Sequence, residues 1–115
     1  MRKRLLFATA TLLMPLLAAA DGPRPGEYAC TEMKGSWLPC TPRHLYLYEG
    51  KQWHWGPADS KNHGDYKVHG RQLKFNGRPH GPVTWGAATW TDDSVTFTDK
   101  KIVAIFTRQG EAQKR

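Results

Sequence analysis

The chain has 115 residues, and its 17 Lys/Arg against 10 Asp/Glu give a formal net charge of +7 at pH 7. A chain of this length fits one domain. The basic residues are scattered and form no basic run with interleaved stacking aromatics, so the composition argues against nucleic acid as a partner. A mild positive charge instead favours acidic partners such as anionic glycans or lipid headgroups.

The first twenty residues predict a secretory signal peptide. Basic residues at positions 2–4 precede an apolar run at 5–17, and three alanines at 18–20 offer a cleavage site before Asp21. An uncleaved anchor is the weaker alternative, because a membrane span needs about 20 apolar residues. We therefore expect residues 21–115 to form one mature domain without a membrane span, periplasmic or secreted. Removing three of the 17 Lys/Arg leaves 14 against 10 Asp/Glu, a net charge of +4.

Cys30 and Cys40 are the two cysteines of the chain, and export would place them in an oxidising compartment. A disulfide between them is the expected outcome. In the loop-entropy description, closing a ring of this size contributes about 2–3 kcal/mol to stability. A redox or metal role is the alternative, but the spacing matches neither C-x-x-C nor a four-ligand zinc set.

The mature chain begins with a Pro/Gly-rich lead-in at residues 21–25 and a first predicted strand at 26–31. The loop that follows, EMKGSWLPCTP, carries Trp37 and Leu38 at its tip. These two side chains are expected either to fold back as a lid on the core or to form an exposed recognition tip.

Residues 43–55 predict a β-hairpin, because apolar and polar residues alternate with period two on both sides of Glu49-Gly50. A three-residue loop at 48–50, with Gly50 at positive φ, pairs residue 47 with 51, 45 with 53 and 44 with 54. Leu45, Leu47, Trp53 and Trp55 then share one face. His44, Tyr46, Gln52 and His54 share the other.

A second hairpin is predicted over residues 64–76, with a type II′ turn at Gly70-Arg71. This turn pairs Val68 with Leu73 and Tyr66 with Phe75. It also places Lys67 opposite Lys74 on the outer face, which is mildly unfavourable.

The last part of the chain predicts three more strands. The first covers residues 83–91 and bends at the small residues 86–88, and strands at 95–98 and 101–109 follow. Matching the turns aligns Trp90 with Val95 and Phe97 with Ile102.

These segments form eight short strands spaced about ten residues apart, with no helical pattern longer than a turn. The expected fold is all-β, a small antiparallel up-and-down meander that closes into a barrel or curls into a sandwich. Its interior is expected to be filled by the chain's own side chains, with at most a small pocket at the mouth.

Three motifs resemble small exported bacterial β-meander proteins in the style of lipocalin-like and avidin-like barrels. They are G-x-Y-x-C, L-x-L-x-x-G and G-x-Y-x-V-x-G-x-x-L-x-F, formed by Gly26/Tyr28/Cys30, Leu45/Leu47 and Gly64/Tyr66/Val68/Gly70/Leu73/Phe75. The resemblance covers residues 26–76 and implies the fold but no activity. Small periplasmic inhibitors of lysozymes or metalloproteases are similar in size, disulfide and barrel shape, although none of their inhibitory motifs occurs here.

Catalytic signatures are missing from the sequence. It contains no G-x-S-x-G, H-E-x-x-H, P-loop or G-x-G-x-x-G motif. Asp92 and Asp93 are adjacent and fit a turn better than an acid/base pair. We expect a protein that is not an enzyme and has no cofactor; a small hydrolase is the remotest alternative.

The expected site is the outer face of the first hairpin. Its candidate residues are Arg43, His44, Tyr46, Gln52 and His54, together with Trp37 of the loop tip. Aromatic rings beside a cation can stack on sugars or centre a protein interface. The other possibility is that the disulfide-held loop covers this face.

The predicted position of His44 opposite His54 suggests a metal site for Zn²⁺ or Cu²⁺ as an alternative, with a third ligand from His63, His69 or His80.

The sequence thus predicts an exported, non-enzymatic binding or inhibitor module of the bacterial envelope. Its partner would be an envelope or extracellular protein or a glycan. A periplasmic metal-binding protein is the alternative.

Overall fold

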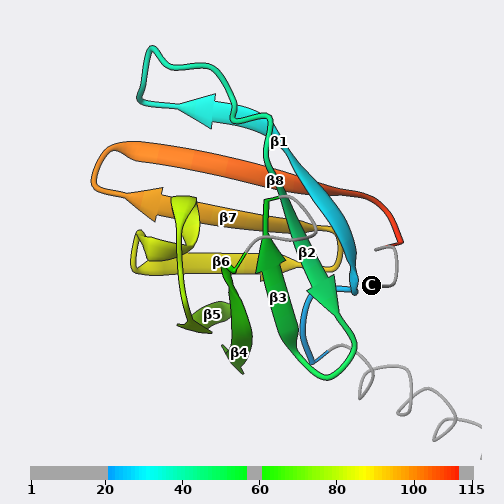
Figure 1. The fold of residues 1–115 in the computed structure, drawn as a ribbon. Coiled ribbons are helices and arrows are strands. Elements are labelled where there is room, and N and C mark those ends of the chain that lie inside the picture. The colour runs from blue at the N-terminus through cyan, green and yellow to red at the C-terminus, as the bar shows by residue number, and fades with distance from the viewer. Residues whose placement is uncertain (1–20, 57–60, 112–115) are drawn as a thin grey trace, which may run out of the picture.

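The computed structural model describes residues 21–56 and 61–111 (Figure 1), so the predicted signal peptide lies outside the described residues. Within those ranges the chain forms eight strands and the short 3₁₀ helix η2, Gly81–Thr84. The strands are β1 Gly26–Lys34, β2 His44–Tyr48, β3 Gln52–Trp55, β4 His63–His69, β5 Gln72–Gly77, β6 Ala87–Thr91, β7 Ser94–Asp99 and β8 Ile102–Gly110. No helix in these ranges is long and apolar enough to cross a membrane.

Every strand pairs with its neighbours in sequence order, and β8 returns to pair with β1, so the antiparallel meander closes into a barrel. Among the described strands, each one therefore has a partner on both sides, as expected for a small all-β domain. The predicted eight-strand meander is confirmed, and of the two architectures considered the chain adopts the closed barrel. This topology fits the lipocalin-like and avidin-like barrels.

The seam between β1 and β8 is the longest pairing in the barrel. It runs from Glu27 opposite Gly110 to Lys34 opposite Val103, with register shifts after Glu27 and after Cys30. The first strand is therefore longer than the predicted 26–31, because β8 continues to pair with it to residue 34. The loop that leads to β2 leaves the end of β1 beside the β7–β8 turn (Figure 1).

The core is filled by the side chains that point inward, at every second residue along each strand. Phe97 lies edge-on to Phe106 at 5.5 Å between ring centres, and Trp53 lies edge-on to Phe75 at 5.7 Å. The Trp53 indole Nε1 donates to the Asn76 carbonyl at 2.8 Å. The buried hydrophobic residues are Tyr28, Leu45, Leu47, Trp53, Trp55, Tyr66, Leu73, Val83, Ala88, Trp90, Val95, Phe97, Ala104 and Phe106.

The first hairpin has the predicted faces but a different register. Its loop is Glu49-Gly50-Lys51, with Gly50 and Lys51 both at positive φ (81° and 59°). The observed pairs are Leu45 with Trp55, Tyr46 with His54, Leu47 with Trp53 and Tyr48 with Gln52. The predicted pairs were wrong by two residues. A shift of two keeps every side chain on its face, so the alternation could not distinguish the registers.

The β7–β8 hairpin differs from the prediction in the same way. Phe97 pairs with Ala104 instead of Ile102, because the turn is formed by Lys100-Lys101 and begins with Lys100 at a φ of 56°. The other predicted pairs are confirmed: Val68 with Leu73, Tyr66 with Phe75, Lys67 with Lys74, and Trp90 with Val95.

The predicted strand at residues 83–91 is only partly correct. Pro82 and Val83 are buried in η2, and β6 starts at Ala87 after Gly86 has turned the chain at a φ of 93°. Proline favours the first turn of a helix and lacks the N–H that a ladder needs. As a result β5 and β6 pair at only two positions, Gln72 with Thr89 and Leu73 with Ala88.

Two buried tyrosines make the stability of the barrel sensitive to alkali. Burial raises the pKa of Tyr66 from 10.0 to about 12, and burial also raises the pKa of Tyr28. Above pH 10 the unfolded chain loses these protons while the folded chain keeps them, so the free energy of unfolding must fall.

We predict that the urea-unfolding free energy falls between about pH 10 and pH 12, by up to about 1.4 kcal/mol per pH unit for each tyrosine. The control is Tyr66→Phe, which keeps the ring and removes the ionisable hydroxyl. The unfolding free energy of this variant should fall less steeply with pH than that of the wild type. Equal slopes in the two proteins would contradict the assignment.

Candidate binding surface

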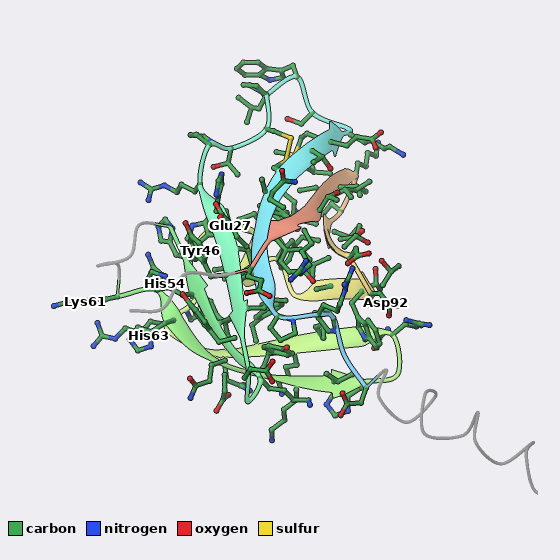
Figure 2. The ribbon with its side chains drawn as sticks, turned by 90° about the vertical axis from the view of Figure 1, so that its right-hand side faces the viewer. Glu27, Tyr46, His54, Lys61, His63 and Asp92 are labelled. Carbon is green, nitrogen blue, oxygen red and sulfur yellow. A yellow bond between two sulfur atoms is a disulfide. The ribbon has the colours of Figure 1, made fainter. Side chains whose placement is uncertain are left out.

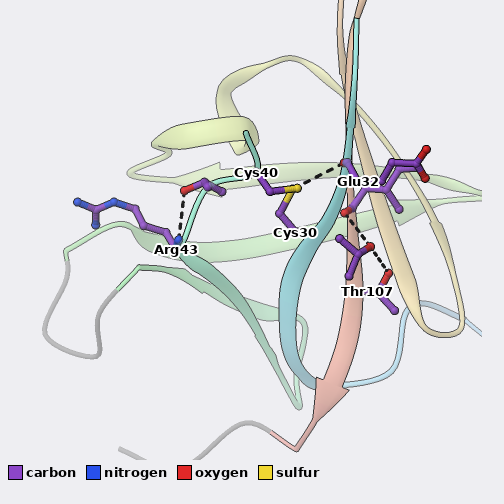
Figure 3. Close-up of a disulfide and its surroundings, with 8 residues drawn as sticks. Cys30, Glu32, Cys40, Arg43 and Thr107 are labelled. Carbon is purple, nitrogen blue, oxygen red and sulfur yellow. Dashed lines mark hydrogen bonds between the residues drawn. A yellow bond between two sulfur atoms is a disulfide. The ribbon is translucent and has the colours of Figure 1, made fainter. Parts of the chain in front are cut away.

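The loop between β1 and β2, residues 35–43 and here called the disulfide loop, is tied to the barrel by Cys30–Cys40 (Figure 3). The predicted disulfide is confirmed, with a Cα–Cα distance of 5.6 Å. Two short turns shape the loop: the Leu38 N–H donates to Ser36 Oγ at 3.1 Å, and the Arg43 N–H donates to Thr41 Oγ1 at 3.1 Å. The loop is therefore held both covalently and by local hydrogen bonds.

The tip of this loop is exposed, so it does not fold back as a lid on the core. Trp37 is 90% exposed and Leu38 is 49% exposed. The chain leaves β1 through Gly35, which has a φ of 77° and lies so close to the β7–β8 turn that a Cβ would be 1.9 Å from the Lys101 carbonyl oxygen. This contact directs the loop outward over the turn.

A groove of about 420 Å³ lies beside the disulfide loop, on the outer face of β2. We call it the Arg43 groove; it is lined by Pro42, Arg43, His44, Tyr46 and Gly56. Arg43 is exposed, whereas the His44 and Tyr46 side chains are half-buried. The Gly56 N–H donates to the His44 carbonyl at 3.0 Å and so holds the two sides of the groove together.

His44 is oriented by a carboxylate from the neighbouring strand. Its Nδ1 is hydrogen-bonded to Glu27 Oε2, and both side chains are about one-third exposed. Because a carboxylate oxygen accepts, Nδ1 donates in this contact, and Glu27 thereby fixes the orientation of the ring. Sequence reasoning missed Glu27. Alternation with Tyr28 places it on the outer face, but only the β1–β2 pairing brings it to His44.

The polar outer face forms a row across four strands. Glu27, Tyr46, His54 and His63 are successive cross-strand partners from β1 to β4, and Figure 2 shows them following one another across the sheet. The Tyr46 ring is 5.8 Å from the His54 ring and 6.3 Å from the His44 ring, between centroids. Tyr46 is therefore the centre of an aromatic surface, and His54 beside it is 6% exposed.

The structure corrects the predicted histidine pair. His44 does not lie opposite His54; its cross-strand partner on β1 is Ala29, and His54 faces Tyr46 and His63. The error follows from the two-residue shift in the hairpin register. Among the residues that the structure describes, no group of three or more His, Cys, Asp or Glu side chains could hold a metal ion.

The remaining predicted residues lie apart from the groove. Gln52 is exposed at the start of β3, between Tyr48 and Asp65. His69 and His80 are exposed at the end of β4 and just before η2. The structure thus brings Arg43, His44 and Tyr46 together, with His54 adjacent; Gln52 lies to one side, and Trp37 forms the separate loop tip.

A larger hollow of about 580 Å³ lies at the end of the barrel where β1 begins. Its two cations are engaged in structural contacts. Arg24 donates to Asp93 from Nε at 2.9 Å, and Arg108 Nε donates to the Pro25 carbonyl at 2.9 Å. Asp93 thereby has a structural role in the predicted turn between β6 and β7. The Arg43 groove is the better candidate because Arg43 is exposed and, among the described residues, forms no ion pair.

The chain was compared with protein-family models, with curated protein sequences and with solved structures, and none of the three comparisons finds a match.

The exposure of the loop tip is directly measurable because the other tryptophans are buried or half-buried. We predict that acrylamide quenches a distinct, red-shifted part of the tryptophan fluorescence, since a quencher reaches only exposed rings. Trp37→Ala should remove this fraction and leave the rest of the emission unchanged. A quenching curve that is the same in wild type and Trp37→Ala would show that Trp37 is covered.

Proposed function

We propose that this protein is an exported, non-enzymatic binding module that holds an acidic sugar unit of a glycan in the Arg43 groove. The observation that carries the proposal is the combination of an exposed guanidinium, an oriented imidazole and an aromatic ring in one open groove. The proposal that the protein is exported is based on the signal peptide expected from the sequence. The likeness to lipocalin-like and avidin-like barrels is a further motive, because such barrels serve as binding scaffolds.

The chemistry of the groove suits a carboxylate- or sulfate-bearing sugar. Arginine binds such anions with two parallel N–H donors, and Arg43 is free to reach an anion from the rim. The Tyr46 ring offers an apolar surface with a polar end, the combination that packs against a sugar ring. A volume of about 420 Å³ is of the size that small ligands occupy.

The groove is held in shape before any ligand arrives. Glu27 fixes the His44 ring, and the hydrogen bond from Gly56 to the His44 carbonyl fixes the backbone beneath it. The disulfide loop limits the movement of Arg43 at the other side. Binding to a preformed site loses less conformational freedom, and this favours recognition by few contacts.

A non-enzymatic role is favoured by the state of the ionisable groups. In the described part of the chain, the groups with a strongly raised pKa are Tyr28 and Tyr66, which are raised by burial in the barrel. Perturbed groups in an open site would instead be expected of an enzyme. The carboxylate next to the groove, Glu27, is engaged by His44.

We predict that the oxidised mature protein binds oligogalacturonate more tightly than a neutral glucan oligosaccharide of equal length, measured by calorimetry. Arg43→Gln should weaken this binding by at least about tenfold, because it removes a charge-assisted contact. Tyr46→Leu should also weaken it. Both residues are on the surface side of the sheet, so the core remains intact.

The matched control is Lys67→Gln, which removes the same charge from an exposed site on β4, two strands away from the groove. It should bind like the wild type. Equal binding of the acidic and the neutral sugar would overturn the proposal, and so would equal losses for Arg43→Gln and Lys67→Gln.

A further inference from the structure

The loop tip has no role in the Arg43 groove, yet its composition and position are unusual for a small domain. Trp37 and Leu38 are the large hydrophobic side chains that the described residues expose, and Pro39 beside them is exposed as well. The disulfide loop that carries them leaves β1 at the end opposite to the one where this strand begins (Figure 1). A buried Trp would stabilise the fold, so this exposed position calls for another cause.

Basic residues surround this tip. Lys34 ends β1 immediately before Gly35, and the close contact of Gly35 with the Lys101 carbonyl brings the Lys100-Lys101 turn against the base of the loop. All three lysines are exposed. Two carboxylates lie near them: Glu32 pairs with Lys34 at 3.5 Å, and Asp99 precedes the turn. The lysines outnumber the carboxylates, so the rim of the tip is positive.

We propose that the loop tip is a docking element for an anionic lipid bilayer surface, independent of ligand binding in the Arg43 groove. The Trp37 ring and the Leu38 side chain lie at the boundary between headgroups and acyl chains, where tryptophan is enriched in membrane proteins. The ammonium groups of Lys34, Lys100 and Lys101 lie at the level of the lipid phosphates. Aromatic insertion combined with basic residues is the general arrangement of reversible surface binding.

A lipid surface fits the shape of the tip better than a pocket on another protein. The apolar part is two adjacent side chains on a convex, projecting loop, whereas a stable protein interface buries about 800 Å² on each partner. A bilayer accepts a convex tip without matching its shape. The disulfide and the Gly35 contact also keep the tip extended when nothing is bound, which lowers the cost of ordering it at the membrane.

The test uses the oxidised mature protein with vesicles of phosphatidylcholine mixed with phosphatidylglycerol, and with vesicles of phosphatidylcholine alone. Co-sedimentation measures binding, and quenching by lipids brominated along the acyl chain reports the depth of the tryptophan ring. We expect binding to the anionic vesicles, with a blue shift and quenching of the Trp37 emission. Trp37→Ala should abolish the shift and most of the binding.

Charge variants separate the basic rim from general positive charge. Each lysine near an anionic surface strengthens binding about fivefold, so Lys100→Gln with Lys101→Gln should weaken it about 25-fold. The matched control, Lys67→Gln with Lys74→Gln, removes two charges from β4 and β5 and should have a much smaller effect. Near-ultraviolet circular dichroism checks that each variant is folded.

Three results would overturn the proposal. The first is equal binding to anionic and neutral vesicles, or none to either. The second is binding that Trp37→Ala leaves unchanged, because it would then depend on net charge alone. The third is that the control variant Lys67→Gln with Lys74→Gln loses as much vesicle binding as the variant Lys100→Gln with Lys101→Gln. Because the groove variant Tyr46→Leu changes no charge and lies outside the disulfide loop, it should bind vesicles like the wild type even if the groove binds no sugar.

Discussion

The pairing of β1 with β8 is the constraint on which the rest of the molecule depends. It joins the first strand to the last and thereby closes an eight-strand meander into a barrel without open edges. It also places β1 between β8 and β2, so that Glu27 reaches His44 across the β1–β2 ladder. The same pairing continues to Lys34, from which the disulfide loop departs (Figure 1). The positions of both the Arg43 groove and the loop tip therefore depend on the β1–β8 pairing.

The disulfide loop lies between the Arg43 groove and the loop tip, and the two differ in the side chains that they present. On its β2 side, Arg43 leads into a groove with an oriented imidazole and an aromatic wall. On its far side, Gly35 turns the chain over the β7–β8 turn and holds Trp37 away from the core. The covalent bond between Cys30 and Cys40 keeps both arrangements in place, since a free loop of this length would sample many more conformations. Surfaces that are ordered in advance are what the proposed binding module requires.

From the sequence, the side of the sheet on which a residue lies could be predicted correctly, but the pairing register of two hairpins could not. Alternation assigned Leu45, Leu47, Trp53 and Trp55 to the core correctly, because period two determines the side of the sheet on which a residue lies. Shifting a hairpin by two residues preserves that assignment, so the histidine pair was wrong while the aromatic face was right. The Glu27–His44 contact depends on residues 17 positions apart in a ladder that local patterns do not specify. The outward direction of Trp37 likewise depends on a contact of Gly35 with Lys101.

The most direct test of this account is an NMR measurement of the neighbours of Ala29. This residue lies opposite His44 on one side and Thr107 on the other, so it reports on both ladders of β1 at once. The account predicts cross-strand nuclear Overhauser contacts from Ala29 to both residues, and slow amide exchange along the β1–β8 seam. Contacts from Ala29 to His44 without any to Thr107 would mean that the barrel is open at this seam, and would contradict the account.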